Sequence, residues 1–167
     1  MGDLSPEELK KRVAIVKRFR ELLIAQRERF NAYLETLEKQ KNIVENGNVD
    51  DILAYVEMEE KMVSDIFSIQ KVIVPLEAQY RSHLKANVAG NVSASGESAG
   101  SDIPEIETAL ERLRVEANNK LEQNRSLLEK RMSEFREELK ALRNNPYIKR
   151  KASFATAESA SFLDIKG

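Results

Sequence analysis

Residues 45–51 read ENGNVDD and lie between two long stretches rich in charged and apolar side chains. Gly47 is expected to end the first stretch as a left-handed helix cap, and Asn48 with Asp51 is expected to begin the next helix. A turn this short forces the second helix to run back along the first. The sequence therefore predicts an antiparallel helical hairpin.

The stretch before this turn has the features of one long helix. Ser5, Pro6 and Glu8 form a capping pattern with proline at the first helical position, where its missing donor costs nothing. Apolar residues then recur at a strict spacing of seven, which is typical of a helix that supercoils with a partner. The recurring residues are Leu9, Val16, Leu23, Phe30, Leu37 and Val44.

The charges of the two stretches are complementary. Residues 7–45 carry ten basic and seven acidic side chains, a net charge of +3, whereas residues 49–87 carry four basic and seven acidic side chains, a net charge of −3. Each exposed ion pair contributes under about 1 kcal/mol to stability. The main effect of this charge pattern is therefore to fix the partner and the register of the two helices. Pro75 lies within the second stretch and predicts a kink there.

The remainder of the chain predicts a third helix between two segments of different composition. Residues 88–101 contain three glycines and four serines, as a flexible linker does. A helix is expected over residues 102–145, with Asp102 as its N-cap. Residues 146–167 are too polar to fold alone and are expected to be a disordered tail. With the hairpin over residues 1–87, the fold class is all-α: an antiparallel coiled-coil hairpin plus a third long helix, like a three-helix bundle.

Composition argues against several classes of function. The chain has no cysteine, one histidine (His83) and a net charge of −1, so a zinc site, a catalytic triad and a nucleic-acid interface are not expected. No apolar run approaches the length of a membrane span, and the first residues lack the apolar core of a signal peptide. We expect a cytoplasmic protein that is not an enzyme and has no cofactor, no metal and no membrane insertion.

One enzymatic alternative rests on arginines of the first helix, since all-helical mutases hold small dianions with such side chains. These arginines spread around the helix without acidic or amide partners at matching spacing. Stabilisation by a small dianion would revive this alternative. The arginines are Arg12, Arg18, Arg20, Arg27 and Arg29.

Two stretches resemble the FlgN-type flagellar export chaperones. Residues 33–81, YLETLEKQKNIVENGNVDDILAYVEMEEKMVSDIFSIQKVIVPLEAQYR, share the family's helix, its short Asn/Gly turn and its Glu- and Lys-rich second helix. Residues 124–142, NRSLLEKRMSEFREELKAL, resemble the family's last helix, which begins Asn-Arg-x-Leu-Leu. Tyr147 stands where such proteins carry a tyrosine after that helix, and the final stretch, RKASFATAESASFLDIKG, has no family counterpart.

The resemblance implies a cytoplasmic chaperone that binds the C-terminal segments of hook–filament junction proteins, prevents their premature assembly and aids their delivery to the export apparatus. The export gate is a second partner that it suggests. An amphipathic cargo helix could lie in a groove along the third helix. The alternative is a structural or scaffolding coiled coil that acts by self-association, and a domain-swapped homodimer also stays open.

The candidate partner-binding residues are the apolar side chains of the third helix and of the tail. We expect the tail to engage cargo or the export gate; it could also cover the groove until cargo displaces it, or be inert. The candidates are Leu121, Leu128, Met132, Phe135, Leu139, Leu142, Tyr147, Phe154 and Phe162.

Overall fold

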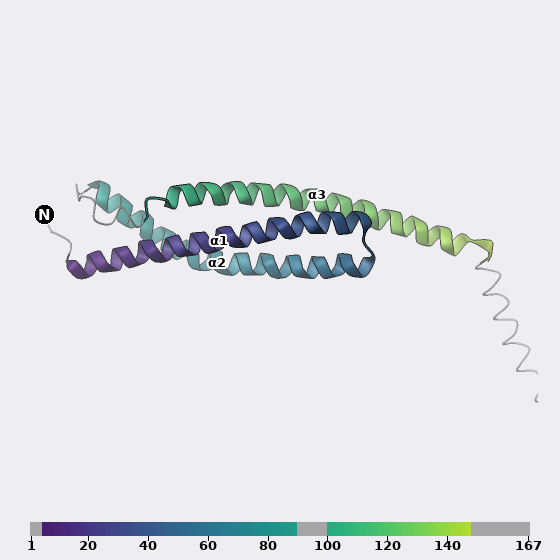
Figure 1. Ribbon diagram of the computed structural model, residues 1–167, viewed down its shortest axis with the longest axis horizontal. Helices are drawn as coiled ribbons and strands as arrows, with labels where there is room; N and C mark the ends of the chain where they lie inside the picture. Colours follow the sequence, from purple (N-terminus) through teal and green to yellow (C-terminus); the bar gives the residue numbers. More distant parts are fainter. Residues whose placement is uncertain (1–4, 90–99, 148–167) are drawn as a thin grey trace, which may run out of the picture. The chain divides into compact units, whose positions relative to one another are not determined.

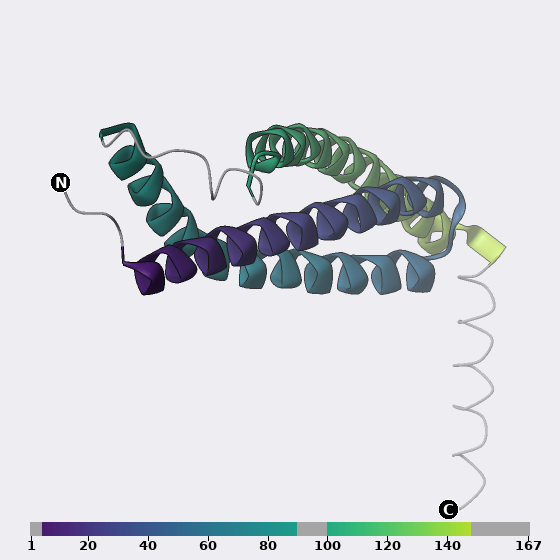
Figure 2. The ribbon, with the colours of Figure 1, turned by 60° about the vertical axis from the view of Figure 1, so that its left-hand side comes forward.

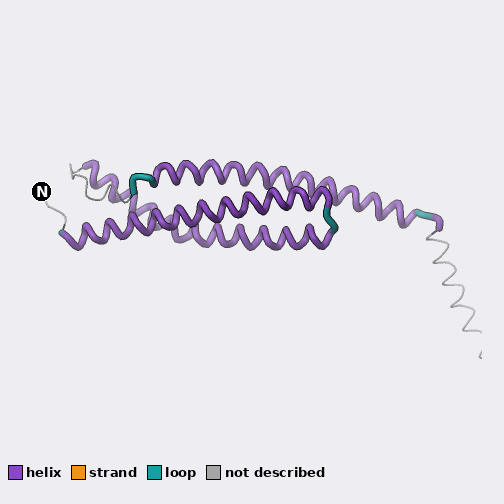
Figure 3. Tube along the Cα trace, in the orientation of Figure 1, coloured by secondary structure: helices purple, strands orange, loops and turns teal. Residues whose placement is uncertain are grey.

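The computed structural model of the protein describes residues 5–89 and 100–147. Three helices occupy these ranges, α1 (Pro6–Asn46), α2 (Val49–Ala89) and α3 (Ile103–Asn144), and no strand is present in them (Figures 1 and 3). The all-α class and the three long helices are confirmed. The predicted linker lies largely outside the described residues, and so does the predicted tail after Tyr147.

The chain divides into two compact units, Met1–Asn124 and Arg125–Gly167. The first contains α1, α2 and the N-terminal half of α3. Within it, α1 and α2 lie side by side and antiparallel, joined by the turn at Gly47 (Figure 1).

The start of α1 has the predicted capping box. The amide of Glu8 donates to the Ser5 hydroxyl over 3.2 Å, and the Ser5 amide donates to the Glu8 carboxylate over 3.1 Å. Two of the amide donors that a helix start leaves unpaired are thereby satisfied, and Pro6 removes a third.

The turn between α1 and α2 corrects one prediction. Gly47 is extended, with φ −88° and ψ 171°, and is not left-handed. Its amide donates to the Ile43 carbonyl over 2.6 Å, and a Cβ at Gly47 would lie 2.5 Å from that same oxygen. Glycine is therefore required for space and not for its sign of φ. Asn48 begins α2 as predicted, since its side-chain oxygen accepts from the Asp51 amide over 2.9 Å.

One core cluster joins all three helices. Phe19 is fully buried and stacks at a tilt on Tyr80, with ring centroids 5.0 Å apart. Apolar side chains of each helix complete the cluster, and aromatic pairs of this geometry add to the stability that area burial gives. The buried members are Phe19 and Leu23 of α1, Ile73 and Tyr80 of α2, and Ile103 and Ile106 of α3.

A second cluster lies nearer the turn. Tyr33, Leu34 and Leu37 of α1 pack there with Ala117 of α3. Along α1, Gln26 falls between the two clusters; it is buried and donates its side-chain amide to the Ile66 carbonyl over 3.2 Å. A polar residue thus interrupts the apolar seam of the hairpin.

Most of the seven-residue line on α1 lies in these clusters or beside them. Leu23, Leu37 and Val44 are buried, and Val16 and Phe30 are half-buried. The exception is Leu9, which is exposed.

The exposure of Leu9 follows from the course of α2. The helix continues through Pro75 without a break. Figure 2 shows its C-terminal part turning away from α1. Within residues 5–89 and 100–147, the first turns of α1 consequently have no antiparallel neighbour there, although the spacing of seven alone predicted one.

Candidate partner-binding surface

The start of α3 is fixed to α1 by a two-pronged ion pair. The Nε of Arg20 donates to both oxygens of Asp102, over 2.8 and 2.9 Å, and its Nη2 donates to Oδ2 over 2.6 Å. Close packing supports this junction, because a Cβ at Gly100 would lie 2.7 Å from the Val16 side chain. Asp102 precedes α3 as predicted, and its carboxylate has a partner 82 residues away that no local pattern indicates.

Hydrogen bonds from Arg20 hold the pKa of the Asp102 carboxyl below its ordinary value of about 3.9. A folded-state pKa below the unfolded one contributes stability above the unfolded pKa, and this contribution is lost as the pH falls through the folded pKa. We expect Arg20→Ala to return the Asp102 pKa toward its ordinary value and to remove this part of the acid sensitivity. Carboxyl carbon chemical shifts followed against pH by NMR measure it.

Arg18→Ala is the matched control, because Arg18 makes an exposed ion pair with Glu21 within α1 and does not reach α3. It should leave the Asp102 pKa unchanged. An Asp102 pKa that is the same in Arg20→Ala as in the wild type would contradict the assignment.

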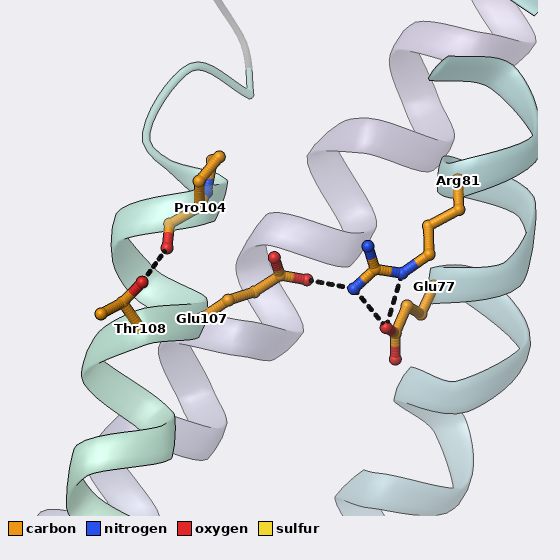
Figure 4. A network of polar contacts seen from close by, with 5 residues as sticks. All are labelled: Glu77, Arg81, Pro104, Glu107 and Thr108. Carbon is orange, nitrogen blue, oxygen red and sulfur yellow. Dashed lines mark hydrogen bonds and ion pairs between the residues drawn. The ribbon is translucent and has the colours of Figure 1, made fainter. Parts of the chain in front are cut away.

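A second ion pair joins α3 to α2. Arg81 donates to Glu77 on its own helix over 2.8 Å and to Glu107 of α3 over 3.4 Å, as Figure 4 shows. Burial raises the pKa of Glu107, Glu77 raises it further, and Arg81 opposes both.

Thr108 donates back to the Pro104 carbonyl over 2.9 Å in the first turns of α3, also drawn in Figure 4.

A buried polar chain connects α3 to the hairpin at the end of the first unit. Asn124 donates to the Leu37 carbonyl over 2.8 Å and to the Gln40 side-chain oxygen over 2.9 Å. Gln40 donates to Glu59 of α2 over 2.8 Å, and Tyr33 donates to the other oxygen of Glu59 over 3.1 Å. Through Gln40, Asn124 thereby links all three helices. Each polar group in this polar chain has a hydrogen-bond partner, which matters because water is scarce in the protein interior.

Asn124 was not among the predicted site residues, although it begins the Asn-Arg-x-Leu-Leu element. A signal was present, since Asn124 lies between Leu121 and Leu128 on the apolar line of α3. A polar residue on such a line is a candidate for a specific buried contact that sets register.

The predicted partner-binding residues divide among three places. Leu121 belongs to the first unit and packs beside the second core cluster. Phe154 and Phe162 lie outside the described residues. The other six fall on one segment of the second unit: Leu128, Met132, Phe135, Leu139, Leu142 and Tyr147.

Five of these six form an apolar stripe on the C-terminal segment of α3. We call Leu128, Met132, Phe135, Leu139 and Leu142 the α3 stripe; they follow one another at spacings of four, three, four and three, which places them on one helix face. Leu128 and Phe135 are half-buried, and Met132, Leu139 and Leu142 are exposed. Tyr147 follows the helix and is also exposed.

Arg131 borders the α3 stripe. Its guanidinium lies 4.5 Å from the centre of the Phe135 ring and donates to Glu134 over 3.1 Å. Its Nε is buried and has no hydrogen-bond partner among the described residues. Stacked on the ring in this way, arginine presents both apolar surface and charge at the edge of the stripe.

Other kinds of site are not formed by the residues that the structure describes. Over residues 5–89 and 100–147, no three His, Cys, Asp or Glu side chains gather as metal ligands would. A surface hollow on α3 is lined by residues of that helix alone, among them Pro104, Thr108 and Arg112. None of the helices in this part of the chain combines the length and apolarity needed to cross a bilayer.

Comparison with known proteins places the chain with one relative. An uncharacterized protein of Treponema pallidum (strain Nichols) is 31% identical over 140 residues, which make up 84% of this chain and 82% of that protein. The chain belongs to the family of this Treponema protein. The match leaves out fewer residues than any one helix contains, so it includes part of each of the three helices of this chain.

No family model matches the chain. No solved structure matches it either. Because the Treponema relative is itself uncharacterized, membership of its family assigns no activity.

Proposed function

We propose that the protein is a cytoplasmic chaperone of flagellar type III export. It binds the C-terminal helical segments of hook–filament junction proteins, keeps them from assembling early and aids their delivery to the export apparatus. The observation that carries the proposal is the α3 stripe, a row of large apolar side chains of which three are exposed on a helix otherwise rich in charge.

The α3 stripe has the form that helix-in-groove recognition uses. Apolar anchors at spacings of three and four residues let an amphipathic helix lie along them, and charged neighbours orient it. The resemblance of residues 33–81 and 124–142 to FlgN-type chaperones supports the choice of cargo, and the α3 stripe lies wholly within the second of these stretches. A binding function of this kind requires no cofactor.

A point substitution on the α3 stripe tests the proposal. The full chain is titrated in a calorimeter with the C-terminal segments of the hook–filament junction proteins from the same genome. We expect one-to-one binding that Leu139→Glu weakens by about tenfold or more, because a buried charge without a partner opposes docking. Leu139 is 59% exposed, so the substitution leaves the fold intact.

Leu53→Glu on α2 is the matched control. Leu53 is 56% exposed, much as Leu139 is, and it is not part of the α3 stripe. It should bind cargo as the wild type does. Absence of binding by the wild-type chain would overturn the proposal, and so would equal loss of affinity in both variants.

A truncation separates the role of the tail from that of the α3 stripe. Residues 1–145 lack Tyr147, Phe154 and Phe162, the tail members of the predicted partner-binding set. Weaker binding by this form would assign the tail to cargo. Equal binding would leave cargo to the α3 stripe and limit the tail to a role at the export gate or to none.

A scaffolding role through self-association is the second candidate function. The charges that flank the α3 stripe favour it, because acidic and basic side chains lie along each side of the stripe and can pair with those of a second copy.

A further inference from the structure

The spacing of the α3 stripe is that of a two-stranded coiled-coil seam. Its members alternate between steps of four and three residues, as the two core positions of a heptad do. Because Met132, Leu139 and Leu142 are exposed, the seam has room for a second helix along this segment. The question is which helix fits it.

Charged side chains flank the seam on both sides. Glu129 and Arg136 lie along one edge, and Arg131 and Glu138 lie along the other, as their positions relative to Phe135 require for a helix of 3.6 residues per turn. Each edge thus has an acidic and a basic side chain seven residues apart, and Arg143 follows on the first edge. Such edge positions set the partner and the orientation of paired helices.

We propose that residues 125–147 of two copies of this chain pair with each other in antiparallel orientation. Placing Met132 against Phe135 of the second copy brings Leu128 against Leu139 of that copy. The α3 stripe then meets itself across a two-fold axis, as in an isologous interface. The partner is therefore a second copy of the same helix.

The charges select this register. On one edge Glu129 faces Arg136 of the second copy, and on the other Arg131 faces Glu138 of the second copy. The two-fold axis repeats each contact, so four ion pairs of opposite sign border the seam. Each contributes little by itself at a solvent-exposed site, and their joint effect is to fix orientation.

Other arrangements bring like charges together. Moving one helix by one heptad in one direction sets Arg136 against Arg136 and Glu138 against Glu138 of the second copy. The same move in the other direction does so for Glu129 and for Arg131. A parallel pair sets Arg131 against Arg136 and Glu138 against Arg143 of the second copy, so its repulsive contacts offset its attractive ones. Like charges directly opposed are destabilising, so these alternatives are disfavoured.

Arg131 adds a contact that a single chain leaves incomplete. Its Nε is buried without a hydrogen-bond partner among the described residues, while its guanidinium lies over Phe135. In the antiparallel pair, the carboxylate of Glu138 from the second copy comes within reach once the arginine side chain turns toward it. A buried donor without a partner is costly, and the pair removes that cost.

Charge reversal in the full-length chain tests the pairing. Sedimentation equilibrium of the wild type without cargo, from micromolar to millimolar concentration, is expected to show a monomer–dimer equilibrium. Arg136→Glu places a glutamate opposite Glu129 of the second copy, a repulsive contact that the two-fold axis repeats. It should therefore weaken the dimer by about tenfold or more. Glu129→Arg should weaken it similarly, and an equal mixture of the two variants should restore dimers, since each chain then supplies the charge that the other lacks.

Lys130→Glu is the control, because position 130 faces away from the α3 stripe and is exposed. It should dimerise as the wild type does. A wild type that stays monomeric at all concentrations would overturn the proposal. A dimer strengthened by Arg136→Glu would also overturn it, since that result belongs to a parallel pair, and so would a mixture that fails to restore dimers.

This inference does not depend on the proposed chaperone function, and the two fail separately. The sedimentation experiment measures self-association without cargo, whereas the calorimetric experiment measures the affinity of the chain for cargo. Where both hold, a second copy and a cargo helix occupy the same stripe, so added cargo segment is expected to dissociate the dimer.

Discussion

Replacement of Phe19 by alanine is expected to lower the free energy of unfolding by about 3–5 kcal/mol, the range for removing a large buried aromatic side chain. Phe19 is 0% exposed, stacks on Tyr80 and contacts a cluster to which all three helices contribute. The loss comprises the transfer free energy of the ring and a cavity that three long helices cannot easily close. Urea unfolding followed by circular dichroism measures it.

Phe67→Ala is the matched control, because it removes the same ring from a site that is 64% exposed. It should change the free energy of unfolding by less than about 0.5 kcal/mol, as surface substitutions do. Equal effects of the two substitutions would show that the first core cluster does not hold the helices together.

Replacement of Asn124 by alanine is expected to cost about 1–3 kcal/mol. Asn124 is buried and donates to the Leu37 carbonyl and to Gln40, and Gln40 in turn donates to Glu59. Without its amide, the Gln40 oxygen loses a donor and cannot reach water. Thermal unfolding measures the global loss, and amide hydrogen exchange around Ala117 measures the local one.

Asn119→Ala controls for composition and helix propensity, since Asn119 is exposed on the same helix. It should be neutral or slightly stabilising, because alanine is the better helix former. Faster exchange near Ala117 in Asn124→Ala alone would assign Asn124 the role of holding α3 on the hairpin. The same exchange rate in both variants would contradict it.

Local chemistry accounts for what the sequence predicted well. The Ser5–Glu8 capping box, the short turn at Asn48 and the seven-residue apolar line each depend on contacts within a few residues or on a period, and each is present in the structure. The all-α class with three long helices followed from these signals and from the scarcity of residues that break helices.

The features that the sequence did not predict depend on contacts between distant segments. Arg20 and Asp102 are 82 residues apart, and Asn124 and Leu37 are 87 apart, so no spacing rule connects them. Leu9 satisfies the heptad yet is exposed, and the C-terminal part of α2 turns away from α1. Gly47 departed from expectation because the nearby Ile43 carbonyl, and not a positive φ, restricts that position.

The candidate surface could be predicted in part. The period of α3 identified the apolar side chains from Leu128 to Leu142, but it could not distinguish Leu121, which packs with the hairpin, from those that are exposed. That distinction depends on contacts with residues distant in the sequence, which an amphipathic period does not encode.

Gln26 has a consequence for how the hairpin unfolds. It lies along α1 between the two apolar clusters, and its Oε1 is buried without a hydrogen-bond partner among the described residues. A break of this kind weakens the cooperativity between the two halves, because the two clusters are made of different side chains. Each half can then open by local fluctuation while the other stays closed, as separate cooperative units do. The end of the hairpin near the turn can therefore retain its packing while the far end exchanges its contacts.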